Sequence, residues 1–590
     1  MRVLFLYPDV GTMLPPDYQH GVGILMALLR RAGHQPGLIY LHDEIGREEL
    51  AARVRAFNPG LFAVSSASNQ FPRAKRYAAW VKVDTGLPIA IGGIHPTLAP
   101  EEVMAEPCFD ILCRGEAEGA MVELADAQDR GADFSGIRNL WVRRGDEVIR
   151  NEVRPLVEDL DALPFPDREG FPFEWILEQR GGNCSILSGR GCPYGCTYCA
   201  NEGLRELYRG RGRFVRQRSV GNVLAEMREI LARYRVTKWD FNDDIFTLKR
   251  EWLKEFCDAY PREFRLPFDV NVRVETVDED ALKMLKDAGC DLIRVGVESG
   301  SERVRREIMG RRMQTEDIVR VFAAADRVGL RTWSFNMTGL PGETPADADE
   351  TYRLNRRLCP DHMQVSVFNP YPATRLHDLC AERGLWSGET RDGYFVPDCS
   401  LNLPEFPPDA VRQAHQKLVH LRDWCHTTKK LRRELGGPPA FDLVDLIEQA
   451  EVETPEKIFV GEDFFTISGD TRRVLRIHPP SRIRFRLTLP AAPALRFAGA
   501  MHPQVWDKEG GDGVVFTVRA GRMVRTMKTI FESTIDPKRV TADRRWHDAV
   551  VDLSAWAGKR VYLEFSTRTV DPARPDHNTV GFGFPVIMER

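Results

Sequence analysis

The stretch "SGRGCPYGCTYCANEG", residues 188–203, carries three cysteines, Cys192, Cys196 and Cys199, in the spacing C-x3-C-x2-C. The chain has 12 cysteines in all, and the other nine are mostly single residues within apolar segments. We expect those nine to be buried, reduced thiols, because nothing in their spacing suggests a disulfide framework. The three clustered cysteines therefore need an explanation of their own.

Thiolates at this spacing favour a metal ion or an iron–sulfur cluster. A structural zinc site normally uses four protein ligands, often as two cysteine pairs, and no fourth cysteine or histidine follows here at the usual spacing. Three thiolates on a four-iron cluster leave one iron open for a substrate or cofactor. The residues alone favour the cluster and leave zinc, a disulfide or a plain loop as alternatives.

The segment around the cysteines alternates between strand and helix patterns. Six apolar runs, each followed by a helical pattern, predict a partial (β/α)6 barrel over residues 181–390. The cysteines follow the first of these strands, and polar or glycine residues end the others, where barrels carry their chemistry. The runs are "CSILSGR", "KWDFNDDIF", "PFDVNVRVE", "CDLIRVGVESG", "RTWSFNMTGLPG" and "HMQVSVFNPYP".

Residues 1–130 read as five further βα units, which predict an open, doubly wound parallel sheet. Ligands of such sheets bind beyond the carboxyl ends of the strands, so the residues after each strand are candidates. Glycines at sheet turns also have a purely structural explanation, and the absence of G-x-G-x-x-G argues against a dinucleotide. The candidates are Ser65, Ser66, Ser68, Gly92, Gly93, Thr97, Gly115 and Glu116.

The remaining segments show other sequence patterns. Residues 131–180 read as a linker with a hairpin, and residues 391–454 as a helical extension that "GGPP" interrupts. From residue 455 to 590, alternating strands with frequent turns predict an antiparallel β-sandwich. The predicted fold class is therefore α/β with a C-terminal β-sandwich.

Composition narrows the function classes. The chain has 590 residues, of which 43% are hydrophobic, and its formal net charge is −4 with 82 basic and 86 acidic residues. This balance gives no general field for nucleic acid. No segment has the roughly 18 apolar residues of a membrane span, and "MRVLFLYPDVG" lacks the features of a signal peptide. We expect a cytoplasmic protein.

The cysteine spacing, with Tyr198 before the last cysteine, closely resembles radical S-adenosylmethionine (SAM) enzymes. "DFNDDIF", "VGVESGS", "MTGLPGET" and "FNPYPATRL" resemble further motifs of this family, at the expected strand ends. The resemblance implies that the three cysteines hold a 4Fe–4S cluster and act in catalysis. It implies cofactor-binding roles for Tyr198, Asp243, Asp244, Arg273, Glu298, Ser299, Gly339 and Asn369.

Some of these roles have plainer alternatives. In the family, the glutamate at Glu298 contacts the SAM ribose, but a strand-end salt bridge would also explain it. Asp243 and Asp244 could instead cap the following helix. Arg273 could pair with a carboxylate of SAM or of the protein. The chemistry that the resemblance implies is reductive cleavage of SAM to methionine and a 5′-deoxyadenosyl radical, which abstracts hydrogen from an unactivated carbon.

The N-terminal sheet, with "VSSAS", "IGGIHPT" and "CRGEAEGA", resembles the cobalamin-binding domain of cobalamin-dependent radical SAM enzymes. The D-x-H-x-x-G motif, whose histidine ligates cobalt in other cobalamin proteins, does not occur. The nearest histidine is His20 in "DYQHGVG", and we expect it at a helix start near the cofactor in preference to a cobalt-ligand role.

These resemblances predict an enzyme that transfers a methyl group from SAM, by way of cobalamin, to an unactivated carbon. A radical rearrangement or cyclisation is the alternative reaction, and a non-catalytic cobalamin or SAM sensor is the alternative class. Methylthiotransferases acting on tRNA are disfavoured, because their second cysteine triad and basic C-terminal domain are missing. An electron donor such as flavodoxin or ferredoxin is implied, with a substrate that the sequence does not identify.

Residues 455–590 resemble galactose-binding-like modules. The resemblance implies that exposed aromatic rings could hold a glycosylated substrate, with Trp506, Trp546 and Trp556 as candidates. Packing into the core is the better expectation for most of these tryptophans.

Overall fold

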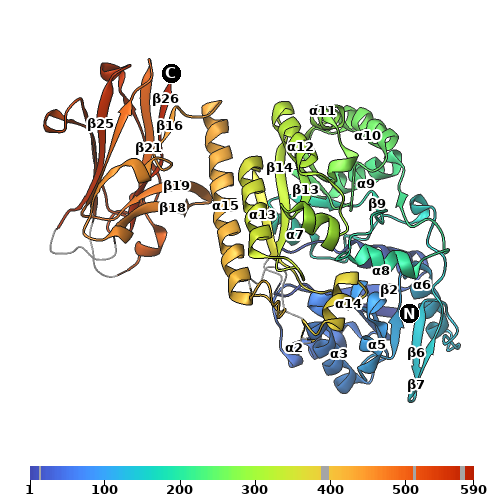
Figure 1. Cartoon of the computed structure of the whole chain (residues 1–590). Helices are drawn as coiled ribbons and strands as arrows, with labels where there is room; N and C mark the ends of the chain where they lie inside the picture. Colours follow the sequence, from blue (N-terminus) through green and yellow to red (C-terminus); the bar gives the residue numbers. More distant parts are fainter. Residues whose placement is uncertain (12–14, 387, 389–397, 509–512, 572–577, 590) are drawn as a thin grey trace. The chain divides into compact units, whose positions relative to one another are not determined.

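The computed structural model describes residues 1–11, 15–386, 388, 398–508, 513–571 and 578–589. The chain divides into two compact units, Met1–Val419 and His420–Arg590 (Figure 1). The predicted domain boundaries within these units stay predictions, and residues 391–397 of the predicted helical extension lie outside the described residues.

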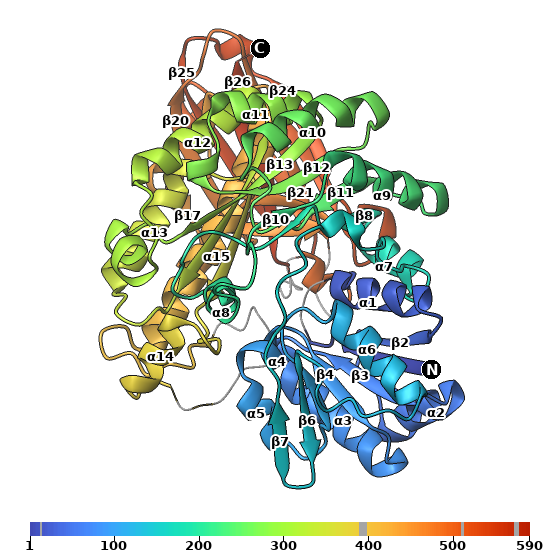
Figure 2. The same cartoon turned by 90° about the vertical axis from the view of Figure 1, so that its right-hand side faces the viewer.

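The first part of unit one is a seven-stranded sheet of order β2-β1-β3-β4-β5-β6-β7. Strands β1 to β5 are parallel, as predicted, and β6 and β7 are antiparallel. The hairpin predicted as part of a linker therefore extends this sheet (Figure 2). The strands are Arg2–Pro8, Gln35–Leu41, Leu61–Ser65, Ile89–Gly92, Ile111–Cys113, Leu140–Arg144 and Glu147–Arg150.

Helices cover both faces of this sheet, because its strands are apolar on both sides. Val3 and Phe5 of β1 pack into one core cluster, while Leu4 and Leu6 pack into the other. The order β2-β1-β3 reverses direction between β1 and β3, which is where doubly wound sheets bind ligands. The helices are α1 His20–Arg31, α2 Arg47–Phe57, α3 Phe71–Thr85, α4 Ile94–Leu98, α5 Pro100–Ala105 and α6 Glu118–Asp129.

The second part of unit one is an open six-stranded parallel sheet of order β15-β14-β13-β12-β11-β8, which confirms the predicted partial barrel. The strands are β8 Asn183–Ile186, β11 Lys238–Phe241, β12 Phe268–Val272, β13 Cys290–Glu298, β14 Arg331–Thr338 and β15 His362–Val367. The helices include α7 Phe173–Gln179, α9 Val220–Arg233, α10 Arg250–Glu263, α11 Glu279–Asp287, α12 Thr315–Val328, α13 Pro345–Leu358 and α14 Arg375–Glu382, and the boundary between the two units falls within α15 Pro408–Leu435.

Between β8 and α9 the chain leaves the barrel and returns. This triad segment, residues 189–217, consists of β9 Gly189–Arg190, the cysteine loop, α8 Ala200–Leu207 and β10 Arg216–Gln217. Its two short strands pair antiparallel, with Arg190 opposite Arg216. All three clustered cysteines therefore lie in a loop whose two ends are tied together.

Unit two holds two antiparallel sheets, of orders β18-β19-β26-β21-β24 and β17-β20-β25-β22-β23, which confirms the β-sandwich. Strands β16 and β17 precede residue 455, the predicted start of this domain. The strands are β16 Phe441–Asp442, β17 Glu451–Glu453, β18 Val460–Ile467, β19 Asp470–Ile477, β20 Ser481–Thr488, β21 Pro493–Met501, β22 Val514–Gly521, β23 Lys528–Ile535, β24 His547–Asp552, β25 Arg560–Thr569 and β26 Val580–Glu589.

The three candidate tryptophans of the sandwich pack inward. Trp546 is buried and donates from Nε1 to the Asp470 carbonyl at 3.1 Å. Trp506 and Trp556 are partly buried against the sandwich core. The expectation of core packing is confirmed for these residues, and a glycosylated substrate stays a prediction.

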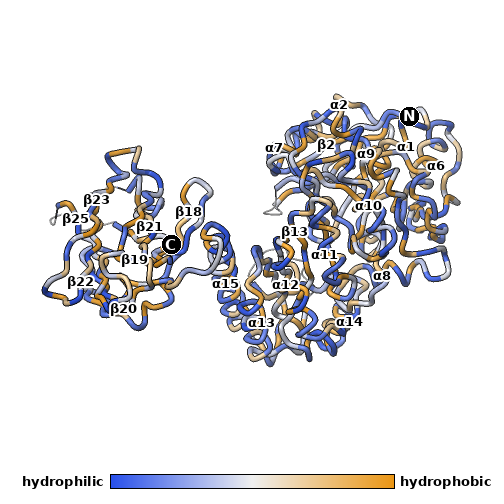
Figure 3. Tube along the Cα trace, turned by 90° about the horizontal axis from the view of Figure 1, so that it is seen from above, coloured by the Kyte–Doolittle hydropathy of each residue, from blue (hydrophilic) through white to orange (hydrophobic). Residues whose placement is uncertain are grey.

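Hydrophobic residues are dispersed along the chain (Figure 3). No helix in the described part of the chain is both long and apolar enough to cross a membrane.

Candidate functional site

Hydrogen bonds fix the loop that carries the cysteine triad. The Thr197 N–H donates to the Met309 carbonyl at 3.1 Å, and the Thr197 hydroxyl donates to the Ile308 carbonyl at 2.6 Å. Arg205 of α8 donates to the Pro193 carbonyl at 2.8 Å. These bonds attach the loop both to the barrel and to the helix that follows it.

Cys196 is the most buried of the three cysteines and lies beside a positive charge. Arg273 Nη1 is 3.5 Å from Cys196 Sγ. The same guanidinium stacks on Tyr194, 3.6 Å from the ring centroid, and pairs with Glu275 at 2.7 Å. The protein carboxylate considered as a partner for Arg273 is therefore Glu275. A guanidinium at this distance stabilises a thiolate or an anionic cluster.

The other two thiols are partly exposed. Burial raises the pKa of Cys192, and it raises the pKa of Cys199 to about 11. Metal binding at these positions therefore has to displace protons. Within the described ranges, no group of three or more Cys, His, Asp or Glu side chains converges on a single-ion site. The donor set of three thiols fits a four-iron cluster with one open iron.

Glu298 ends β13 in a strained conformation next to the triad loop. Its φ is +66°, in the left-handed region that residues with side chains rarely adopt. Its carboxylate lies 3.4 Å from Arg311 Nη1, which also donates to Tyr198 Oη at 3.1 Å. A Cβ at Gly296 would lie 2.5 Å from Glu298 Oε1, so glycine allows the carboxylate to fold back. The expected strand-end salt bridge is present, and strain of this kind is typical of functional sites.

The two candidate aspartates after β11 differ in how far their carboxylates are free to bind a ligand. Both oxygens of Asp243 accept from the Ser188 N–H at 3.1 Å, and Oδ1 also accepts from the Ser188 hydroxyl at 2.8 Å. Burial raises the pKa of Asp243 to about 6. Asp244 is exposed and lies near Asn201 and Cys199. Neither aspartate caps α10, whose N-cap residue is Lys249. Of the two, Asp244 is the one open to a ligand.

The remaining barrel candidates lie in separate surroundings. Ser299 is fully buried, with its hydroxyl 3.3 Å from that of Thr351 in α13. The Gly339 N–H donates to Glu343 Oε2 at 2.6 Å, and burial raises the pKa of Glu343 to about 8. Asn369 Oδ1 is buried and accepts no hydrogen bond from any described residue. A bound ligand is one way to satisfy such an atom.

A cavity of about 390 Å³, here the sheet cavity, lies between the N-terminal sheet and the start of the barrel. It opens at the carboxyl ends of the parallel strands, as expected for a doubly wound sheet. Five predicted residues line it, together with apolar strand residues and the segment 160–166. They are Ser65, Gly92, Gly93, Gly115 and Glu116.

A second cavity of about 570 Å³, here the triad cavity, extends from the same loops to the end of the cysteine loop. It reaches Cys199, Asn201 and Asp244. Both cavities are mostly apolar with a few charged groups, which fits a large ligand with an apolar face and polar edges. The residues common to both walls are Gly93, Gly115, Glu116, Leu187, Gly189 and Arg190.

Two of the predicted glycines are required by close contacts within the chain. A Cβ at Gly93, with φ +107°, would lie 2.6 Å from the Ser66 carbonyl oxygen. A Cβ at Gly115, with φ +82°, would lie 1.9 Å from Tyr208 Oη. Gly92 has no such conflict, because its nearest neighbours would be 3.7 Å away. The need for a ligand to approach the backbone closely could therefore explain the glycine at position 92, whereas packing within the protein explains those at 93 and 115.

Three predicted polar residues contact the protein and do not line the sheet cavity. The Ser66 hydroxyl bonds the next residue's carbonyl at 2.9 Å, and Ser68 lies 3.2 Å from His95 Nδ1. Thr97 Oγ1 accepts from the Gly115 N–H at 3.0 Å and lines the triad cavity. These residues shape the loops that carry the cavity-lining glycines.

Glu116 is fully engaged by protein donors. Its Oε1 accepts from Arg190 at 2.9 Å and Arg216 at 2.8 Å, while Oε2 accepts from Arg216 at 3.0 Å and the Val157 N–H at 3.2 Å. A carboxylate has about four acceptor sites, so this one has none left for a ligand. Burial raises the pKa of Glu116, but the two guanidinium groups outweigh burial and lower it.

His20 begins α1 and lines the sheet cavity, as expected for a helix-start histidine. Its Nε2 lies 2.8 Å from Ser185 Oγ of β8, and Asn242 donates to the same hydroxyl at 2.9 Å. Burial lowers the pKa of His20 to about 3, so the ring is neutral. Because Nε2 already has a partner, the geometry favours a position beside the ligand over ligation of cobalt.

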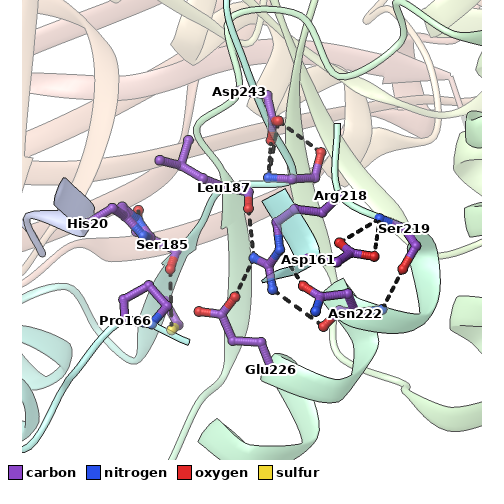
Figure 4. Close-up of polar contacts among 12 residues, drawn as sticks. His20, Asp161, Pro166, Ser185, Leu187, Arg218, Ser219, Asn222, Glu226 and Asp243 are labelled. Atoms are coloured by element: carbon purple, nitrogen blue, oxygen red, sulfur yellow. Dashed lines mark hydrogen bonds and ion pairs between the residues drawn. The ribbon is translucent and has the colours of Figure 1, made fainter. Parts of the chain in front are cut away.

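A buried ion triad supports the wall of the sheet cavity. Arg218 lines the cavity, donates to the Leu187 carbonyl at 3.0 Å and pairs with Glu226 (Figure 4). Arg168 pairs with the same carboxylate at 2.5 Å. Glu226 is 1% exposed. Burial raises the pKa of Glu226, but Arg168 and Arg218 outweigh it and hold the pKa below its ordinary value of 4.5.

We expect Glu226→Gln to destabilise unit one by about 3–5 kcal/mol, because two buried guanidinium groups lose their counter-charge. Urea unfolding measures this change, with Glu263→Gln, which removes an exposed partner of Arg228, as a control that costs less than about 1 kcal/mol. Since the folded pKa is depressed, the contribution is present above pH about 4.5 and is lost as the pH falls through the folded value. Equal effects of the two substitutions would contradict this account.

Sequence reasoning missed several residues of the site. Arg190 and Arg216 lie on the triad segment and contact Glu116, while Arg311 contacts Glu298 and Tyr198. For Arg216 a signal was present in the arginine-rich run 205–218 after the triad, whereas Arg190 and Arg311 lie outside this run. It could not identify their partners, which lie far away in sequence.

The chain matches two family descriptions, the B12 binding domain over residues 17–125 and the Radical SAM superfamily over residues 186–354. The first match runs from just before α1 into α6 and so includes β2 to β5, and the second runs from the last residue of β8 into α13. The chain therefore carries a B12-binding domain followed by a radical SAM domain.

Known proteins are similar in sequence to this chain over about two thirds of its length. An uncharacterized methyltransferase of Pyrococcus horikoshii is 26% identical over 428 residues, which are 71% of this chain and 91% of the relative. The anaerobic magnesium-protoporphyrin IX monomethyl ester cyclase of Cereibacter sphaeroides is 25% identical over 64% of this chain and 63% of its own length.

A solved structure of a radical SAM methyltransferase shares the fold of this chain. The radical SAM methyltransferase TsrM from Kitasatospora setae, determined with cobalamin and a 4Fe–4S cluster, has a TM-score of 0.55 and 20% identity. The likeness covers 71% of this chain and 85% of that chain.

Proposed function

We propose that this enzyme transfers a methyl group from SAM, by way of cobalamin, to an unactivated carbon of its substrate. The observation that carries the proposal is that the sheet cavity and the triad cavity share lining residues, so that one wall separates the cobalamin-binding sheet from the cavity that reaches Cys199. When bound, the 4Fe–4S cluster, SAM and cobalamin supply a one-electron reductant, an abstracting radical and a methyl carrier.

Cys192, Cys196 and Cys199 hold the cluster in this proposal. Arg273 stabilises the negative charge at Cys196 from 3.5 Å. Glu298 binds the SAM ribose hydroxyls, and its strained backbone and Arg311 contact keep the carboxylate in place.

Other residues complete the proposed SAM site. Asp244 faces the site from the wall of the triad cavity, and Asn369 offers an unused acceptor. Tyr198 fixes Arg311. Asp243, Ser299 and Gly339 are held by protein contacts, with Ser188, Thr351 and Glu343 respectively.

Cobalamin occupies the sheet cavity and extends toward the triad cavity in this proposal. Ser65 and Gly92 line the sheet cavity without an opposing protein contact at Gly92. The neutral His20 ring faces the cofactor, and its bond to Ser185 links the cobalamin-binding sheet to the barrel. The apolar strand residues exclude water from the cavity.

The reaction also needs an electron from outside the chain. Reductive cleavage of SAM consumes one electron, and we propose flavodoxin or ferredoxin as its donor. A cytoplasmic location, where such donors occur, stays a prediction.

A radical cyclisation without methyl transfer is the second candidate. The observation that favours it is the similarity to the cyclase of Cereibacter sphaeroides, which covers 64% of this chain. The two candidates share SAM cleavage and differ in whether a methyl group leaves SAM.

The test is anaerobic reconstitution with iron, sulfide and hydroxocobalamin, followed by addition of SAM and dithionite. We expect about four irons per chain, bound corrinoid and formation of 5′-deoxyadenosine. Methyl transfer also forms S-adenosylhomocysteine, and labelled SAM then passes its methyl group to bound cobalamin. Cluster and 5′-deoxyadenosine without corrinoid would contradict the cobalamin role and the methyl transfer. Bound zinc without SAM cleavage would contradict the whole proposal.

A further inference from the structure

The triad segment is attached to one loop of the cobalamin-binding sheet at three points. Arg190, two residues before Cys192, donates to Glu116 at 2.9 Å. Tyr208, directly after α8, accepts from the Glu116 N–H at 2.7 Å. Arg216, where the segment returns to the barrel, holds both oxygens of Glu116. A single residue of the sheet therefore contacts the beginning, the middle and the end of the segment that carries the cysteines.

This contact is buried, charged and closely packed. Arg216 is 5% exposed and Tyr208 is also 5% exposed. Glu118 adds a second carboxylate to Arg190 at 2.7 Å. Gly115 allows the closest approach, since any Cβ there would collide with Tyr208. Removing one partner of a buried charge pair leaves the other uncompensated, so separating the loop from the segment is energetically costly.

The same residues form walls of both cavities. Gly115, Glu116 and Arg190 line the sheet cavity and also the triad cavity. A ligand that orders the loop after β5 in one cavity therefore orders the segment that leads into Cys192. The carboxylate of Glu116 has no free acceptor site, so its effect on either ligand is exerted through the arginines and not by direct contact.

We propose that Glu116 is a positioning residue that couples the cobalamin site to the SAM and cluster site. This inference rests on the proposed function, and it adds that each cofactor tightens the binding of the other. Coupling of this kind is reciprocal, so hydroxocobalamin strengthens SAM binding by the same factor by which SAM strengthens hydroxocobalamin binding. Protein couplings are typically about 5–150-fold, and we expect about tenfold here.

The experiment measures binding and needs no turnover. The cluster-reconstituted enzyme is titrated anaerobically with hydroxocobalamin, with and without saturating SAM, and with SAM, with and without hydroxocobalamin. No reductant is added, so SAM stays intact. We expect the two ratios of Kd to agree at about ten in the wild type and to approach one in Glu116→Gln. Glu116→Asp keeps the charge and should restore part of the coupling.

Matched variants separate coupling from general damage. Glu123→Gln removes a carboxylate that pairs with Arg154 on the exposed side of α6 in the same sheet domain, and it should keep the wild-type ratio. If Glu116→Gln does not fold, Tyr208→Phe tests the coupling in its place. This substitution removes only the hydroxyl that accepts a hydrogen bond from the Glu116 N–H, and it should lower the ratio of Kd values. Equal ratios in the wild type and in the folded Glu116 or Tyr208 variant would overturn the inference, as would a wild-type ratio of one.

Failure of the proposed function gives a different result. If hydroxocobalamin does not bind the wild type at all, or SAM does not bind the reconstituted cluster, the proposed function is wrong and the coupling falls with it. If both bind and the ratio is one, the function stands and only the role of Glu116 is wrong.

Discussion

Cys196→Ala is expected to abolish formation of 5′-deoxyadenosine while the protein stays folded. Cys196 is the middle thiol of the triad, 7% exposed, and the one beside Arg273. Without it, two partly exposed thiols remain, and a four-iron cluster that needs three protein thiolates has no stable site. Iron content and the cluster absorbance should fall together with 5′-deoxyadenosine, measured after reconstitution with dithionite as reductant.

Cys257→Ala is the matched control for this prediction. Cys257 is 8% exposed on α10 of the same barrel, outside the triad loop, so the same substitution leaves the cluster site intact. We expect its iron content and SAM cleavage to equal those of the wild type. A Cys196→Ala protein that still binds about four irons and cleaves SAM would show that Cys196 is not a cluster ligand.

The elements around the triad could be predicted because their signals are local. Each barrel strand is a short apolar run that ends in polar residues, and all six of these runs form strands of one parallel sheet. The triad itself is a spacing motif within one loop, so its position needed no knowledge of tertiary contacts. The same holds for β1, where Leu4 and Val3 pack on opposite faces of the predicted sheet.

The role of individual side chains could not be predicted in the same way. Glu116 meets Arg216 across 100 residues of sequence, and Asp243 meets Ser188 across 55. The sequence pattern marked both acids as ends of strands and gave no partner for either. Their hydrogen-bonding capacity is used by the protein, and only the tertiary structure reveals this.

The hairpin β6–β7 illustrates a third limit. Its strand pattern was visible in "LWVRRGDEVIRNEV", but the pattern does not say which sheet edge accepts it. In the structure, β6 pairs antiparallel with β5 and completes the N-terminal sheet. An exposed edge strand is a site for unwanted pairing, so covering β5 with a hairpin of the same chain protects the sheet.

Gly92→Phe is expected to weaken hydroxocobalamin binding by at least about 100-fold, or about 2.8 kcal/mol, while SAM cleavage with dithionite continues. Gly92 ends β4 on the wall of the sheet cavity, and its backbone tolerates a Cβ, so the phenyl ring occupies the proposed ligand space without strain at the turn.

Gly46→Phe is the control, since that glycine precedes α2 in the same domain with nothing within 4 Å of a Cβ. Absorbance titration gives the Kd, and chromatography of 5′-deoxyadenosine and S-adenosylhomocysteine gives the two reactions. Loss of S-adenosylhomocysteine alone would separate methyl transfer from radical formation, as the proposal expects when only the wall of the sheet cavity is changed. Unchanged corrinoid affinity in Gly92→Phe would instead place cobalamin outside the sheet cavity.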